Sequence, residues 1–196
     1  LFNGVGGGAA ALVAIVEYLN LGDGASFGEV LATVFTVLVG SVSFSGSVIT
    51  FLKLQELMTT RPVVFPGGRF VIAATLAGAL GTSGWVIASG GTTPLLVLAG
   101  LSLLFGVLFV LPVGGADVPI VISLLNAFTG LTVAASGYVL QSTLLIVAGT
   151  LVGASGTILT RKMAEAMGRS LFGTLFGAFT AKPQAASEAG EVRPVK

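Results

Sequence analysis

The sequence predicts an all-α protein, a polytopic bundle of transmembrane helices whose C-terminus lies on the cytoplasmic or matrix side. Hydrophobic residues make up 54% of the 196 residues and charged residues only 9%, whereas a soluble domain carries about 25% charged residues. Six apolar segments approach or exceed the roughly 20 residues that span the hydrocarbon core of a bilayer. All nine Lys and Arg fall on one side, in alternate connections, at the end of the sixth segment or in the tail, and the positive-inside rule orients that side inward.

The six predicted helices follow one another through short connections. They cover approximately residues 3–19, 29–52, 70–88, 95–113, 118–140 and 143–167. Short links, such as 89–94 and 140–143, make successive helices antiparallel neighbours. The other set of connections holds no basic residue, only Glu17, Asp23 and Glu29. The number of helices and their orientation therefore support each other.

Small residues form faces on three of these helices. Helix 3–19 has Gly4 and Gly8 one turn apart, helix 29–52 contains the run GSVSFSGS, and helix 143–167 has Gly149, Gly153 and Gly156 on one side. Small faces allow membrane helices to approach closely, and this packing provides much of their association. We expect close helix contacts at these positions.

The connection before helix 118–140 carries the clearest start signal. Gly114 and Gly115 permit a tight turn, Asp117 suits the N-cap, and Pro119 fits the first helical turn. Capping is sufficient to explain Asp117. The alternative is that Asp117 also faces a cytoplasmic partner, together with Arg169.

The chain divides into three regions by composition. Residues 1–168 hold the transmembrane bundle. Residues 169–180 contain an apolar stretch too short to span a bilayer, and we expect it to lie at the interface. Residues 181–196 are polar, with the composition of a flexible linker.

Several classes of site are disfavoured. The chain has no Cys and no His, so we expect no disulfide, no thiolate site and no metal centre, and we place no catalytic residue or bound cofactor in this segment. Basic residues are dispersed, which argues against a nucleic-acid partner. Residues 4–9 match the letters of a dinucleotide-binding loop, but that loop needs a preceding strand and a βαβ unit. We interpret these glycines as a packing face.

Two asparagines are the most informative polar residues within the predicted helices. Asn3 lies near the inner end of the first helix, and Asn126 lies about eight residues into the fifth. Serines such as Ser47 and Ser155 can bond to their own helix, but an amide needs other partners. The two asparagines either join helices by hydrogen bonds or line a narrow hydrated path, and the sequence leaves both interpretations open.

Four stretches, in this order, resemble the membrane domain of the beta subunit of proton-translocating NAD(P)+ transhydrogenase. They are FNGVGGGAAA (2–11), SFSGSVITFLKLQ (43–55) with RPVVFPG (61–67), VGGADVPIVISLLNAFTG (113–130) and VGASGTILTRKMAEAMGRS (152–170). The tail GEVRPVK (190–196) resembles the linker before that family's NADP(H)-binding domain. The resemblance covers essentially the whole chain.

The resemblance implies an enzyme that transfers hydride between NAD(H) and NADP(H) on soluble domains and couples this transfer to proton movement through the membrane domain. It implies further helices before Leu1, an NADP(H)-binding domain after Lys196, and an alpha subunit with an NAD(H)-binding domain. The complete enzyme is then a homodimer in the bacterial inner membrane or the mitochondrial inner membrane. Apart from the bilayer, the cofactors and partners are thus expected outside this segment.

The resemblance also assigns residues to the proton path, position by position. Asn3 matches a polar residue that is histidine in some members and asparagine in others. Ser47, Asn126, and the pair Ser155 and Gly156 match further path positions. Because an amide does not titrate near neutral pH, Asn3 favours a gated water path over a histidine shuttle.

Three more positions match residues at the two ends of the path. Asp117 and Arg169 match cytoplasmic-end residues implicated in coupling to the NADP(H)-binding domain, and Glu29 matches an acidic residue at the opposite mouth. Gly168 departs from the family pattern, where many members have Asn.

A different class of function remains an alternative on sequence alone. A secondary transporter or channel for a small solute, with no redox role, would also place polar residues within apolar helices. A purely structural anchor would not need them.

Overall fold

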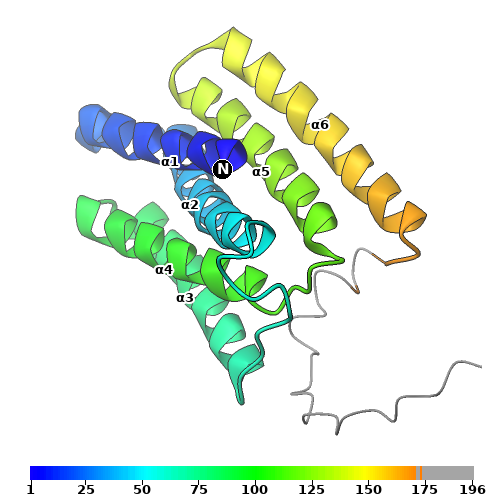
Figure 1. The fold of residues 1–196 in the computed structure, drawn as a ribbon. Coiled ribbons are helices and arrows are strands. Elements are labelled where there is room, and N and C mark those ends of the chain that lie inside the picture. The colour runs from blue at the N-terminus through cyan, green and yellow to red at the C-terminus, as the bar shows by residue number, and fades with distance from the viewer. Residues whose placement is uncertain (171–172, 174–196) are drawn as a thin grey trace, which may run out of the picture.

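The computed structural model describes residues 1–170 and 173, and this part of the chain is helical, without strands. Each of its six long helices is long and apolar enough to cross a membrane (Figure 1). They are α1 (Phe2–Leu21), α2 (Phe27–Leu54), α3 (Gly68–Ser89), α4 (Thr92–Val110), α5 (Val118–Val139) and α6 (Thr143–Ala166), with a short 3-10 helix η1 (Gly22–Gly24) after α1. The predicted all-α transmembrane bundle is confirmed. The predicted interfacial segment and linker lie almost entirely outside the described residues.

Helix α2 is the centre of the bundle. In its membrane-spanning window 61% of residues are buried, against 22–44% for the other five helices. Figure 1 shows α1 and α2 between the α3–α4 pair and the α5–α6 pair. Because α2 contacts α1, α3, α4 and α5, a polar side chain on α2 can meet several helices at once.

The helix bounds differ from the predicted ones mainly in α4. This helix begins at Thr92 and ends at Val110, three residues earlier at each end than the sequence indicated. Pro94 is accommodated because the backbone N–H groups of a first turn have no partner within the helix. The predicted connection 89–94 is therefore shorter than expected.

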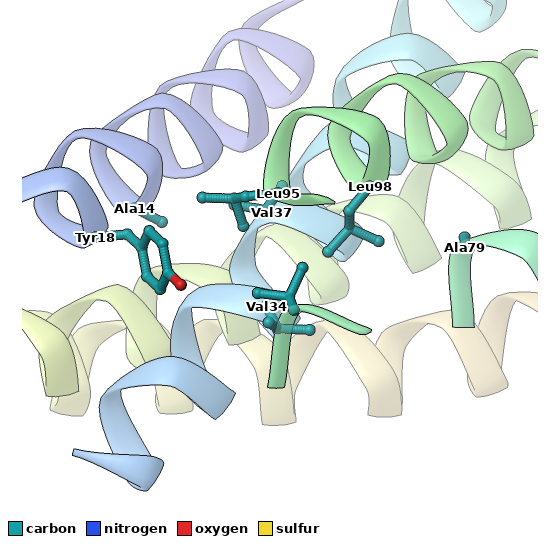
Figure 2. Close-up of a cluster of buried hydrophobic side chains, with 8 residues drawn as sticks. Ala14, Tyr18, Val34, Val37, Ala79, Leu95 and Leu98 are labelled. Atoms are coloured by element: carbon teal, nitrogen blue, oxygen red, sulfur yellow. The ribbon is translucent and has the colours of Figure 1, made fainter. Parts of the chain in front are cut away.

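Two apolar clusters surround α2 at different heights. One joins α1, α2, α3 and α4 and is shown in Figure 2; it consists of Ala14, Tyr18, Val34, Val37, Ala79, Val86, Leu95 and Leu98. The other joins α2, α4 and α5 and the loop between the last two; it consists of Ile49, Val110, Val113, Val118, Val121 and Leu125. Along α2, residues 38–48 separate the two clusters. This interval contains most of the small polar residues of the helix.

Glycines set the closest helix contacts, as predicted. A Cβ atom on Gly7 of α1 would lie 3.0 Å from the carbonyl oxygen of Gly40 on α2. A Cβ atom on Gly130 of α5 would lie 2.6 Å from the backbone nitrogen of Gly153 on α6. Side chains at these positions would push the helices apart. The residues that match the dinucleotide-binding letters thus lie inside α1 and pack against its neighbours.

Candidate functional site

A cluster of hydrogen-bonded polar side chains joins α1, α2 and α5. The amide nitrogen Nδ2 of Asn3 donates to Oγ of Ser47 at 2.9 Å and lies 3.4 Å from Oγ of Ser43. The hydroxyls of Ser43 and Thr129 are 2.6 Å apart, and each lies 3.0 Å from the carbonyl oxygen of Leu125. We call Asn3, Ser43, Ser47 and Thr129 the polar cluster. Asn3, predicted from sequence, is thus brought together with Ser47.

Glycines of α1 allow this cluster to form. A Cβ atom on Gly4 would lie 3.0 Å from Cβ of Ser47, and one on Gly7 would lie 3.0 Å from Cβ of Ser43. Without side chains at these two positions, α1 lies close enough to α2 for the short Asn3 side chain to reach the serines. The packing face and the candidate functional residue therefore belong to one arrangement.

A cavity of about 100 Å³ opens beside Asn3 on the basic side of the bundle. It is lined by Leu1, Asn3, Ser47, Thr50, Phe51, Leu54, Gln55 and Ile122. The Oδ1 atom of Asn3 is buried and accepts no hydrogen bond from any described residue. A volume of this size has room for a few water molecules, and the polar residues Asn3, Ser47, Thr50 and Gln55 contribute to its lining. The cavity can therefore bring water from the basic side to the polar cluster.

Asn126 lies elsewhere, on the outer surface of the six described helices. It is exposed, and its side chain forms no hydrogen bond with another described residue. One turn further along α5, Thr129 faces Ser43 of α2 and Gly130 faces Gly153 of α6. Asn126 therefore lies on the side of α5 between α2 and α6. Among the described residues, the structure does not bring Asn126 together with the other predicted path residues, and its place in a path stays a prediction.

The two predicted residues of α6 differ in their surroundings. Gly156 is buried, and a Cβ atom there would lie 2.9 Å from Cβ of Ala127 on α5. Ser155 is exposed and lies 3.3 Å from the carbonyl oxygen of Val152, one turn back in its own helix. Gly156 thus contributes to helix packing, and Ser155 does not meet the polar cluster.

Asp117 and Arg169 lie together at the basic end of the bundle. Oδ1 of Asp117 and Nε of Arg169 are 3.1 Å apart, but the geometry is that of an ion pair without a hydrogen bond. Asp117 occupies the N-cap position of α5, as predicted, although its side chain makes no capping hydrogen bond. The side chain of Asp117 therefore does not cap α5, and its charge is paired with that of Arg169 instead.

Glu29 lies in the first turn of α2, at the end of the bundle opposite to the cavity. Its Oε2 atom accepts a hydrogen bond of 2.8 Å from the backbone N–H of Ser26, and its own N–H donates to Oγ of Ser26 at 3.3 Å. This reciprocal pair is a capping box. The local role of Glu29 is to start α2, and a role at the mouth of a path stays a prediction.

Sequence reasoning missed Lys53, which it counted only among the basic residues of the connections. Lys53 lies in the last turn of α2 and is only 1% exposed. Its Nζ atom donates to the carbonyl oxygens of Val110, Leu111 and Val113 at 3.3, 2.5 and 2.8 Å. No sequence pattern distinguishes this lysine from a solvated one. Ser43, in contrast, could have been found, because it lies one turn before Ser47 on the same face of α2.

The apolar helices and the one-sided basic residues define a multi-pass membrane protein with a polar cluster inside its bundle. The family model described as NAD(P) transhydrogenase beta subunit matches residues 1–196. Two curated relatives, both named NAD(P) transhydrogenase subunit beta and both from Rhodospirillum rubrum, are 37% identical over 96% of this chain. The chain belongs to the NAD(P) transhydrogenase beta subunit family. It spans 42% of the length of these relatives.

Proposed function

We propose that this chain is the proton-translocating membrane part of an NAD(P)+ transhydrogenase. Hydride transfer between NAD(H) and NADP(H) takes place on soluble domains that bind these cofactors, and the bundle couples the transfer to proton movement. The observation that carries the proposal is the polar cluster at the end of the cavity. Family membership provides the redox reaction to which a proton path would be coupled.

The chemistry of the polar cluster suits a water path. None of its four members titrates near neutral pH, so protons would move along water molecules that the amide and hydroxyl groups orient. The Oδ1 atom of Asn3 is an acceptor without a described protein partner, and the hydroxyls of Ser43 and Thr129 extend the hydrogen-bonded chain into the bundle. Such a path needs a gate, because an open one would dissipate the proton gradient.

The contact between α1 and α2 closes this path toward the opposite side. One turn beyond Ser43, a Cβ atom on Gly40 would lie 2.6 Å from the carbonyl oxygen of Gly7, which leaves no space for water between the two backbones. The cavity meanwhile reaches Asn3 from the basic side. We interpret this arrangement as a state open to the basic side, with a shift of α1 against α2 as the opening movement.

We place the coupling surface at the ion pair of Asp117 and Arg169. Both side chains are at the basic end of the bundle and partly accessible, so a docked NADP(H)-binding domain could compete for either charge. The alpha subunit and a second copy of the enzyme complete the proposed assembly, in a bacterial or mitochondrial inner membrane. The cavity beside Asn3 does not favour a small-solute transporter, since its volume is only about 100 Å³.

Reconstitution of the complete enzyme in sealed vesicles tests the proposed function. Reduction of NAD+ by NADPH, or the reverse reaction, should change the pH inside the vesicles, and a protonophore should abolish this change while accelerating hydride transfer. A pH indicator enclosed in the vesicles and the absorbance of the nucleotides follow the two events together. Hydride transfer without a protonophore-sensitive pH change would refute the proposal.

We expect Asn126→Leu to abolish proton-coupled transhydrogenation and to leave uncoupled hydride transfer on the soluble domains largely intact. An amide exposed at this depth needs a polar partner, since lipid provides none, and we propose that a helix of the complete enzyme covers it and extends the path. Val133→Leu is a matched control, because it adds bulk two turns further on the same face of α5 without removing an amide. Unchanged proton pumping by Asn126→Leu would remove this residue from the path.

A further inference from the structure

We propose that Lys53 is a positioning residue that links the α4–α5 loop, which carries Asp117, to the polar cluster through α2. The inference rests on the proposed function, in which Asp117 receives the NADP(H)-binding domain and the polar cluster conducts protons. According to this inference, the buried side chain of Lys53 connects Asp117 to the polar cluster.

The contacts of Lys53 fix the end of α4. Its ammonium group has three donors, and they meet the carbonyl oxygens of Val110, Leu111 and Val113. These carbonyls lie at the C-terminus of α4, where helix carbonyls have no partner in the helix and carry partial negative charge. A buried ammonium is costly unless it is well bonded. If the loop moved away from Lys53, both the ammonium group and the carbonyl oxygens would lose their hydrogen-bond partners.

The same loop is tied to the segment that follows α2. The N–H of Val63 donates to the carbonyl oxygen of Leu111 at 3.0 Å, and the N–H of Gly115 donates to that of Thr60 at 3.0 Å. Together with the bonds of Lys53, these contacts hold residues 111–115 against the end of α2. Asp117, the N-cap of α5, follows two residues later. Asp117 is therefore held in place through the end of α2, and it does not move as part of a free loop.

Helix α2 carries the connection to the polar cluster. Ser47 precedes Lys53 by six residues, which is about 9 Å along a helix, and Ser43 lies one further turn away. The serines face α1 and α5, whereas Lys53 faces the end of α4. A displacement of the loop that moves Lys53 must then move the hydrogen-bond partners of Asn3.

Lys53 is not placed to carry protons itself. Thr50, Phe51, Leu54 and Gln55 line the cavity, but Lys53 does not, and its three donors are bonded to backbone oxygens. Its contribution is geometric. The quantity that reports it is the ratio of protons translocated to hydride transferred, which does not depend on how much active enzyme is present.

The test compares Lys53→Met with Lys162→Met in the complete enzyme reconstituted in vesicles. Met keeps the length of the side chain and removes the charge and the donors. Lys162 is a suitable control because it is an exposed lysine near the same end of the bundle, paired with Glu165. We expect the proton-to-hydride ratio to fall roughly fivefold or more in Lys53→Met, within the usual range of coupling between sites, and to remain unchanged in Lys162→Met. Lys53→Arg, which keeps a charged donor, should retain a higher ratio than Lys53→Met.

Two further measurements separate the possible outcomes. If Lys53 acts through the loop, Lys53→Met combined with Asp117→Asn should lower the ratio no more than the stronger single substitution does. If Lys53→Met does not fold, Lys53→Gln replaces it, and the same comparison is made. An unchanged ratio in an enzyme that translocates protons would overturn the role of Lys53 alone, whereas a wild-type enzyme that translocates none would overturn the proposed function.

Discussion

Asn3→Leu is expected to lower the rate of proton-coupled hydride transfer by roughly five- to 150-fold. The substitution leaves Ser47 without its donor and replaces an amide that lines the cavity with an apolar group. A buried polar group that loses its partner costs about 1–3 kcal/mol. We apply this cost to the barrier for proton transfer through the polar cluster, where each 1.4 kcal/mol or so is a factor of ten in rate. The Leu side chain also fills part of the space that water would occupy. Simultaneous recording of vesicle pH and nucleotide absorbance measures the effect.

Asn20→Leu provides the matched control for this substitution. Asn20 is exposed near the other end of α1, so the same change of side chain there leaves the polar cluster intact. Hydride exchange between the soluble domains should continue in both variants, because in the proposed function the nucleotides bind to those domains and not to α1. Should Asn3→Leu pump protons at the wild-type rate, the polar cluster would be a structural contact between helices and the path would lie elsewhere.

The helices were predictable because their cause is local. A segment of about 20 apolar residues must be helical in a bilayer to bond its own backbone, and the one-sided distribution of Lys and Arg determines its direction. Within α4 the prediction was displaced by three residues at each end. Pro94 was interpreted as part of a connection. At the other end Pro112, which lacks an N–H, disfavours further helix, and Lys53, a residue remote in sequence, bonds the carbonyl oxygens there.

The site was predictable only in part, because its members come from helices far apart in the chain. Sequence reasoning could select Asn3 as a costly residue in an apolar helix, but Ser43 and Thr129 become its neighbours through the crossing of α1, α2 and α5. The exposure of Asn126 has the same origin, since the side of α5 that is covered depends on where its neighbours lie. Asp117 fitted a local capping role, and the sequence placed Arg169 at the same end of the bundle, but the ion pair between the two side chains is seen only in the structure.

Gly130→Leu is expected to destabilise the packing of α5 against α6. Gly130 lies at a close contact of α5 and α6, where even a Cβ atom would come within 2.6 Å of the backbone nitrogen of Gly153 and 2.8 Å of the Val152 side chain. A Leu side chain adds three further carbons, so the two helices must separate. Overpacking of a dense interior costs about 1–3 kcal/mol or more, which predicts a melting temperature lower by roughly 5 °C or more.

Thermal unfolding of the purified enzyme in detergent, followed by circular dichroism, measures this loss. Gly81→Leu is the matched control, because Gly81 lies on the exposed side of α3 and a Cβ atom there would meet nothing within 4 Å. Separation of α5 from α6 would also displace Thr129, the residue next to Gly130, from Ser43. Gly130→Leu should therefore lose coupling as well as stability, and equal melting temperatures for the two variants would show that α6 does not need the close glycine contact to hold α5 in place.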